Sequence, residues 1–168
     1  MARVSLILGG ARSGKSARAL ALADPPHVFI ATAQALDGEM AERIARHKAE
    51  RGANWALVEE PLELAEAIRA NGTEGTMVVD CLTLWLSNLI HRERDIGAAT
   101  DALVAALGDA PGRVVLVSNE VGMGLAPMTA LGRDFRDAQG RLNQRIAGVA
   151  DHVEFVAAGL PLVLKGAP

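Results

Sequence analysis

The residues with the clearest chemical meaning lie near the amino terminus, where residues 9–16 match the pattern G-x-x-x-x-G-K-S at every fixed position. Glycines in such a loop let backbone N–H groups point at phosphate oxygens, and a helix beginning behind the loop adds a positive field. A hydrophobic run precedes the loop and an Ala/Leu-rich stretch follows it, which favours this interpretation over an ordinary glycine-rich turn. We predict a nucleoside triphosphate site made by Gly9, Gly10, Ala11, Arg12, Ser13, Gly14, Lys15 and Ser16, with Lys15 catalytic at the β- and γ-phosphates and Ser16 a Mg²⁺ ligand.

A carboxylate at the end of a neighbouring strand is the second requirement of such a site, because it orders the water shell of the metal. Asp80 follows the hydrophobic run 76–79 and is predicted to bind Mg²⁺ through water. Asp80 could also cap the helix expected near Thr83, and the two roles do not exclude each other. A second run, 113–117, ends in Ser118-Asn119-Glu120, which places Asn119 and Glu120 near the same site.

Residues 43–51 read R-I-A-R-H-K-A-E-R and place four cations and His47 on one short helical stretch. One interpretation is a solvated amphipathic helix. The other is a surface that handles phosphate, in which His47 attacks phosphorus as a nucleophile. Neighbouring cations would lower the pKa of His47, keep its ring neutral and stabilise departing pyrophosphate. The residue pattern leaves both interpretations open.

Aliphatic runs typical of buried parallel strands alternate with stretches of helical period. This alternation predicts an α/β, three-layer P-loop NTPase (RecA-like) fold: a mostly parallel sheet of about seven strands flanked by helices, in one domain over residues 1–168. The expected strands are 4–8, 27–31, 55–58, 76–79, 113–117, 152–156 and 162–164, and the expected helices 15–23, 38–51, 62–70, 83–91, 97–107 and 129–149.

Composition narrows the class of protein further. Half of the 168 residues are hydrophobic and 22% are charged, which favours a folded domain over a disordered chain. A net charge of −3 gives no sign of a nucleic-acid partner. Cys81 is the only cysteine, which excludes an internal disulfide and a Cys-based zinc site. The apolar run near the amino terminus is too short to span a membrane, so we expect a cytoplasmic protein.

Several further motifs give the sequence a specific resemblance. The phosphate loop is followed by I-A-T-A-Q at 30–34, R-I-x-x-H-x-x-x-R at 43–51 and V-D-C-L-T at 79–83. Next come V-S-N-E-V-G-M-G at 117–124, G-R-D-F-R-D through G-R-L-N-Q over 132–144, and A-G-L-P at 158–161. In this order, and over almost the whole chain, they resemble the bifunctional adenosylcobinamide kinase / adenosylcobinamide-phosphate guanylyltransferase family of cobalamin assembly.

The resemblance implies two reactions in one protein. In the first, a hydroxyl of adenosylcobinamide takes the γ-phosphoryl group of ATP or GTP. In the second, GTP donates GMP to the new phosphate through a GMP–histidine intermediate, giving adenosyl-GDP-cobinamide and pyrophosphate. His47 occupies the histidine of the family motif and is therefore the implied nucleophile, with Arg46, Lys48 and Arg51 balancing phosphate charge.

The resemblance also implies where the guanine nucleotide binds and how the chain assembles. Nucleotide contacts are expected at Thr32, Ala33, Gln34, Lys48, Ala49, Glu50, Arg51 and Glu59. Glu59 could accept hydrogen bonds from the guanine N1–H and 2-amino groups, with Glu60 as the alternative. Related proteins imply a homo-oligomer, in particular a trimer.

Two other functions remain compatible with the residues. One is a plain small-molecule P-loop kinase in which the histidine stretch is only a lid, and the other is a non-catalytic GTP-binding module. Four arginines, 133, 136, 141 and 145, either form a solvated helix face or clamp a phosphate. His27, His91 and His152 are expected to be structural or solvated, and Trp55 and Trp85 to anchor a core or an interface.

Overall fold

The structure is a computed structural model that describes residues 3–34, 38, 41–42, 45, 49 and 54–167. Its strands are β1 (Val4–Gly9), β2 (His27–Ala31), β3 (Trp55–Glu59), β4 (Thr76–Asp80), β5 (Arg113–Asn119), β6 (His152–Ala157) and β7 (Leu160–Lys165). Its helices are α1 (Lys15–Ala21), α3 (Leu64–Ala70), α4 (Leu82–His91), α5 (Ile96–Asp109) and α6 (Ala130–Val149). Every predicted strand is present, so the alternation of strands and helices is confirmed.

The strands form one sheet in the order β3-β2-β4-β5-β1-β6-β7. Neighbouring strands run parallel except β7, which pairs antiparallel with β6. β5 therefore lies between β1, which leads into the phosphate loop, and β4, which ends at Asp80. Because parallel strands end at the same edge, this order gathers the polar residues that follow β1, β4 and β5.

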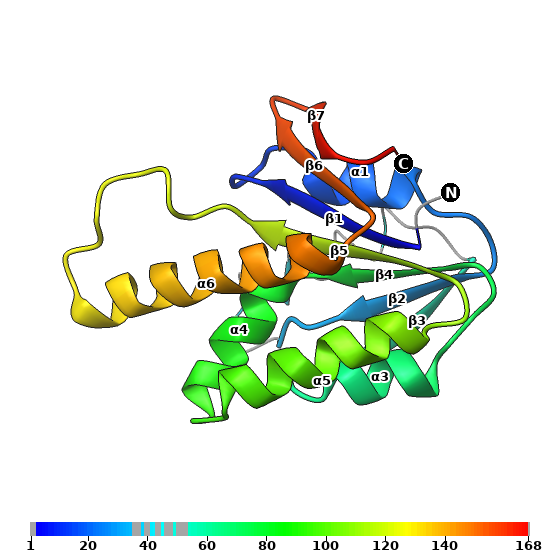
Figure 1. The fold of residues 1–168 in the computed structure, drawn as a ribbon, viewed down its shortest axis with the longest axis horizontal. Helices are drawn as coiled ribbons and strands as arrows, with labels where there is room; N and C mark the ends of the chain where they lie inside the picture. The colour runs from blue at the N-terminus through cyan, green and yellow to red at the C-terminus, as the bar shows by residue number, and fades with distance from the viewer. Residues whose placement is uncertain are drawn as a thin grey trace.

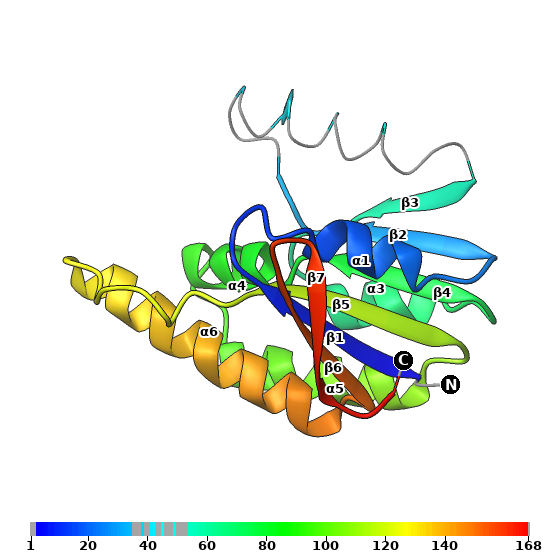
Figure 2. The same cartoon turned by 90° about the horizontal axis from the view of Figure 1, so that it is seen from above.

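Helices cover both faces of the sheet, which gives three layers (Figures 1 and 2). Helix α1 covers one face, and α3, α4, α5 and α6 cover the other. Successive strand residues point to opposite faces, so Leu6 and Leu8 join the larger apolar cluster and Ile7 the smaller one under α1. Burial on both faces explains why the central strands are continuous aliphatic runs.

Trp85 anchors the larger cluster, as predicted. Its side chain is 1% exposed, and its indole N–H donates to the carbonyl of Leu62 at 2.8 Å, so the buried polar atom is satisfied. Trp55 lies on β3, where its ring stacks on His27 with 4.5 Å between ring centroids.

The outer strands differ from the expectation of strands buried on both faces. Three of the five residues of β3 are exposed, and all six of β7 are exposed. Both strands lie at edges of the sheet, where one side has no neighbouring strand within the described part of the chain. The helix predicted over 38–51 lies largely outside the described residues, although 38, 41–42, 45 and 49 are helical. None of the helices in the described part of the chain has the length and apolar character that crossing a bilayer requires.

Candidate active site

The predicted phosphate loop connects β1 to α1 and has the geometry that its glycines suggest. A Cβ on Gly9 would lie 2.4 Å from the Ser13 hydroxyl oxygen and 2.6 Å from the carbonyl oxygen of Val156, so only glycine fits there. Gly14 has φ of 95° and precedes the first residue of α1. The loop therefore curls tightly before the helix begins.

Lys15 is 8% exposed, and its Nζ atom donates to the carbonyl oxygen of Gly10 at 3.0 Å. This bond folds the lysine back along the loop, so its charge lies beside the backbone that would surround a phosphate. Ser13 is buried as well, and its hydroxyl has no hydrogen-bond partner among the residues that the structure describes. A loop with a held cation and a spare buried hydroxyl suits an anionic ligand.

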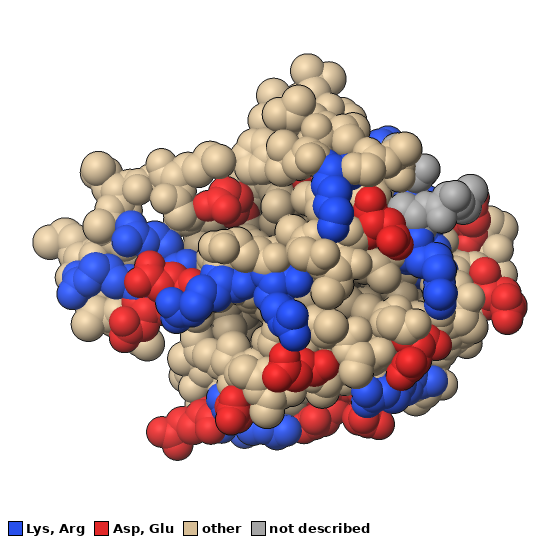
Figure 3. Space-filling model, in the orientation of Figure 1, with Lys and Arg blue, Asp and Glu red and all other residues tan. Residues whose placement is uncertain are grey.

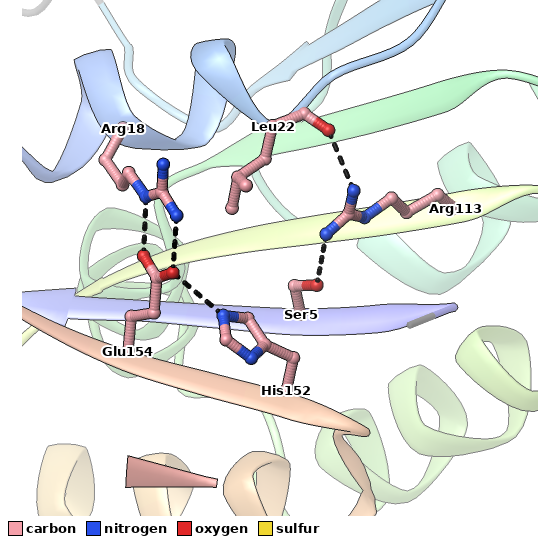
Figure 4. Close-up of polar contacts among 6 residues, drawn as sticks. All are labelled: Ser5, Arg18, Leu22, Arg113, His152 and Glu154. Atoms are coloured by element: carbon pink, nitrogen blue, oxygen red, sulfur yellow. Dashed lines mark hydrogen bonds and ion pairs between the residues drawn. The ribbon is translucent and has the colours of Figure 1, made fainter. Parts of the chain in front are cut away.

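The side chains of two arginines hold α1 against the sheet (Figure 4). Arg18, one turn after Lys15, donates Nε and Nη2 to the two carboxylate oxygens of Glu154 on β6, both at 2.7 Å. Arg113 on β5 donates to the carbonyl oxygen of Leu22, at the end of α1, at 2.9 Å and to the Ser5 hydroxyl at 3.2 Å. The helix that carries Lys15 is therefore fixed at its middle and at its end.

Glu154 is fully buried and also contacts His152, with 2.9 Å between Oε1 and the histidine Nε2. The two hydrogen bonds from Arg18 hold the pKa of Glu154 below its ordinary value, while burial acts in the opposite direction. The same pair raises the pKa of Arg18. Glu154 is thus a buried carboxylate kept ionised by its partners.

We expect Glu154→Gln to lower the free energy of unfolding by about 3 kcal/mol at pH 7, because it leaves Arg18 without its carboxylate. A carboxyl whose pKa is depressed on folding stabilises the protein fully above its unfolded pKa, near ~4.3, and loses that effect as the pH falls through the folded pKa. The difference between wild type and variant should therefore shrink below about pH 4 in urea denaturation.

The matched control is Arg145→Gln, which breaks an exposed pair with Asp101 at 3.1 Å. That change should alter the free energy of unfolding by less than about 1 kcal/mol. Equal losses in the two variants would show that the buried pair does not hold α1.

Asp80 ends β4 and is half-buried at the carboxyl edge of the sheet, level with Ala31 of β2. It does not cap the next helix: the cap residue of α4 is Cys81, whose Sγ accepts from the N–H of Leu84 at 3.5 Å. The capping interpretation is therefore wrong, and the Asp80 carboxylate has no capping role to perform. Burial raises the pKa of the Cys81 thiol to about 11, with a further contribution from the charge of Asp80, so this cysteine stays protonated at neutral pH.

Thr32 joins the end of β2 to the end of β4. Thr32 is fully buried. Its hydroxyl donates to the Cys81 carbonyl at 2.7 Å and accepts from the Cys81 N–H at 2.9 Å. Its own carbonyl accepts from the Asn88 side chain at 2.9 Å. Thr32 therefore positions the Asp80–Cys81 junction. Ala33 and Gln34, which follow it, are half-buried. Nucleotide contact by these three residues stays a prediction.

Asn119 ends β5 directly beside the phosphate loop, at the register position of Gly9. Its N–H donates to the Thr83 hydroxyl at 2.9 Å, and its carbonyl accepts from the Asn143 side chain at 3.1 Å. Beneath it, Ser118, Gln139 and Asn143 form a buried hydrogen-bond network with distances of 2.7–3.0 Å. The next residue, Glu120, donates its N–H to the carbonyl of Gly9 at 3.0 Å.

The two glutamates at the end of β3 have different surroundings. The Glu60 carboxylate accepts from the N–H groups of Leu62 and Glu63, both at 2.9 Å, and so shapes the turn before α3. Glu59 is exposed at the carboxyl end of β3, at the register position of Ala31. Guanine recognition by Glu59, with Glu60 as the alternative, stays a prediction.

The predicted nucleophile His47 and its neighbours Lys48, Glu50 and Arg51 lie outside the described residues, whereas Ala49 is helical and exposed. The other histidines take structural or solvated positions, as expected: His27 stacks on Trp55, His91 is exposed at the end of α4, and His152 is buried against Glu154. In the described part of the chain, no three His, Cys, Asp or Glu side chains are grouped as metal ligands.

Figure 3 shows basic side chains, which in this helix are all arginines, along α6 with acidic side chains among them. Arg136 lies 3.7 Å from Asp137, and Arg145 pairs with Asp101. Arg133 donates to the carbonyl oxygens of Pro127 and Met128, both at 3.0 Å. These contacts favour a solvated helix face over a phosphate clamp within one chain.

Three features of the site were missed in the sequence. The Arg18–Glu154 pair joins residues 136 positions apart, and no local sequence pattern predicts it. The turn between β6 and β7 also contacts the phosphate loop, because the Gly159 N–H donates to the Ser13 carbonyl at 2.8 Å. The network beneath Asn119 is the third; its only sequence signal is the placement of Gln139 and Asn143 four positions apart on one helix face.

The chain is similar to a family of known proteins over nearly its whole length. The model of the family described as cobinamide kinase / cobinamide phosphate guanyltransferase matches residues 5–164. The chain is 49% identical to the bifunctional adenosylcobalamin biosynthesis protein CobP of Pseudomonas aeruginosa, over 97% of this chain and 98% of that protein. It is 42% identical to the bifunctional adenosylcobalamin biosynthesis protein CobU of Salmonella typhimurium, over 95% of this chain and 98% of that protein.

Among solved structures, the P4 protein from bacteriophage phi13 aligns with a TM-score of 0.50 and 15% identity, covering 96% of this chain and 53% of that chain. At this identity the likeness concerns the fold alone, and it agrees with the predicted P-loop NTPase architecture.

Proposed function

Because the chain belongs to the cobinamide kinase / cobinamide phosphate guanyltransferase family, we propose that its phosphate loop and His47 divide two successive transfers between them. The protein is a transferase of cobalamin biosynthesis, with kinase and guanylyltransferase activities. The observation that supports the proposal most is the carboxyl edge of the sheet, where the loop holding Lys15 lies beside Asn119 of β5, and β5 in turn lies beside the strand that ends at Asp80.

In the kinase step, the loop binds the triphosphate of ATP or GTP through its backbone N–H groups, and Lys15 neutralises charge that develops on the β- and γ-phosphates. Residues 9–16 all take part in this cradle. Fixed by Arg18 and Arg113, α1 keeps the lysine and the loop in register. The acceptor is the hydroxyl of adenosylcobinamide.

The residues present fit a Mg²⁺ ion held jointly with the nucleotide. Ser16 is half-buried in the first turn of α1, and Asp80 is half-buried at the same sheet edge, which supplies one hydroxyl and one carboxylate. Such a sparse oxygen set is typical of Mg²⁺ bound with substrate phosphates. When bound, the ion neutralises phosphate charge, and Asp80 orients its water ligands.

Asp80→Asn tests that assignment. We expect the Mg²⁺ concentration for half-maximal phosphoryl transfer to rise about 10–100-fold, because Asp80 acts on the ion through water. A titration of Mg²⁺ at saturating nucleotide measures this half-maximal concentration. Asp137→Asn, at an exposed position of α6, is the control, and an unchanged Mg²⁺ requirement in Asp80→Asn contradicts the role.

In the guanylyl step, a ring nitrogen of His47 attacks the α-phosphorus of GTP, the bond to the bridging oxygen breaks, and pyrophosphate leaves. The phosphate of adenosylcobinamide phosphate then attacks the same phosphorus and releases the histidine. Arg46, Lys48 and Arg51 offset the charge of the leaving pyrophosphate. The exposed carboxylate of Glu59 reads the guanine edge, with further nucleotide contacts at Thr32, Ala33, Gln34, Lys48, Ala49, Glu50 and Arg51.

The two activities can be followed with labelled nucleotide. With adenosylcobinamide and Mg²⁺, γ-label from ATP or GTP should appear in cobinamide phosphate, and α-label from GTP in GDP-cobinamide. Transfer of the γ-label alone would indicate a plain kinase, and GTP binding without either product a non-catalytic module. Assembly into a trimer and a cytoplasmic location stay predictions, and the exposed edge strand β7 is compatible with contact between copies.

A further inference from the structure

The chain between β5 and α6 carries an unusual run of exposed apolar side chains. Figure 1 shows this segment extending away from the sheet before it returns to α6. Met123 is 79% exposed, Leu125 98% and Met128 97%. Large apolar side chains that are exposed close together in the chain are candidates for a binding surface.

This segment begins at the phosphate site. Glu120, its first residue, donates its N–H to the carbonyl of Gly9, the residue at which β1 enters the phosphate loop. β5 separates β1 from β4, so the residue that follows β5 lies between the loop and the strand ending in Asp80. A group at this position borders the space in which a γ-phosphate bound to the loop must lie.

Both ends of the segment are anchored. At its start, the network of Asn119 with Thr83 and Asn143 fixes the end of β5. At its far end, Arg133 donates to the carbonyls of Pro127 and Met128. The Glu120 carboxylate accepts from the N–H of Gly122 at 2.5 Å, which turns the chain outward immediately after it.

We propose that residues 120–128 form the acceptor side of the phosphoryl-transfer site, in which Glu120 takes the proton of the acceptor hydroxyl and Met123, Leu125 and Met128 contact the corrinoid. The inference rests on the proposed function for the identity of the acceptor. A corrinoid is a broad ring with methyl groups on its faces, and methionine and leucine side chains adapt well to such a surface. The segment joins that apolar surface directly to the phosphate site. A surface that only contacts a second copy of the chain would not need this connection.

In the proposed step, the hydroxyl oxygen of the acceptor forms a bond to the γ-phosphorus while the bond from that phosphorus to the β–γ bridging oxygen breaks. The nucleoside diphosphate leaves with the bond electrons, and the hydroxyl proton passes to the Glu120 carboxylate and then to solvent. The guanylyl step needs no such base, because its acceptor is a phosphate oxygen.

Glu120→Gln tests the base. We expect kcat for phosphorylation of adenosylcobinamide to fall about 10²–10³-fold with the KM for nucleotide unchanged. Guanylyl transfer to preformed cobinamide phosphate should keep its wild-type rate. Wild-type phosphorylation by this variant overturns the assignment, and so does equal loss of both activities. If wild type itself phosphorylates no corrinoid, the proposed function fails instead.

Leu125→Ser tests the acceptor surface without endangering the fold, since the side chain is almost fully exposed. The KM for adenosylcobinamide should rise roughly 10-fold, with the KM for nucleotide unchanged. Leu162→Ser, at an exposed leucine of β7, is the matched control and should leave both values unchanged. An unchanged corrinoid KM in Leu125→Ser, together with a smaller mass in solution, would assign the surface to a second copy and overturn the proposal.

Discussion

With His47→Ala, we expect guanylyl transfer to cobinamide phosphate to fall by a factor on the order of 10³ or more, while phosphorylation of adenosylcobinamide continues at the wild-type rate. In the proposed mechanism, this variant lacks the nucleophile that carries GMP. It leaves the phosphate loop unchanged, with Lys15 bonded to Gly10 and α1 tied to Glu154. Chromatography of the two corrinoid products, with α- and γ-labelled GTP in parallel, measures both rates in one sample.

His91→Ala is the matched control, because it removes an exposed histidine at the end of α4. Both reactions should keep their rates in this variant. Full guanylyl transfer by His47→Ala would show that another side chain carries GMP, or that the substrate phosphate receives GMP directly from GTP. Loss of both reactions in a folded His47→Ala protein would contradict the separation of the two transfers.

With Lys15→Met, we expect the rate of γ-phosphoryl transfer to fall about 10²–10³-fold, because one preorganised positive group is lost from the developing charge. Methionine keeps most of the aliphatic stem of this 8%-exposed side chain, so the packing of the loop changes little. Initial rates with γ-labelled ATP and GTP measure the effect, and thermal unfolding of the variant checks that the fold is retained.

Lys165→Met is a demanding control, since Lys165 also donates to backbone carbonyls, those of Ala147 and Gly148 at 3.0 and 3.2 Å. It lies on the edge strand β7, not in the phosphate loop. Equal effects of the two substitutions would show that loss of a carbonyl contact, not loss of charge at the phosphates, lowers the rate.

The strands and the phosphate loop could be predicted because their causes are local. Continuous aliphatic runs are required where strands are buried on both faces, and the spacing of Gly9, Gly14 and Lys15 is required by the loop itself. The exposure of β3 and β7 was not predicted, because it depends on their places at the sheet edges. An aliphatic run such as that of β7 has the same appearance at an edge as in the centre.

The contacts that position the site depend on the assembled fold and could not be predicted. Glu154 lies in a hydrophobic run, and its pairing with Arg18 follows only from the neighbouring positions of β6 and α1. The sequence likewise contained no sign that the Glu60 carboxylate shapes the turn before α3. The residue types were enough to predict phosphate binding by the loop. The contacts that hold the loop and α1 in place could not be predicted, because they join residues far apart in the sequence.

The most direct test of the account is to locate the covalent nucleotide. The protein is incubated with α-labelled GTP and Mg²⁺, digested at alkaline pH to preserve a phosphoramidate, and its peptides are sequenced by mass spectrometry. The account predicts one GMP on His47, labile in acid and discharged to GDP-cobinamide when adenosylcobinamide phosphate is added. An adduct on another residue, or product formation without any adduct, would contradict it.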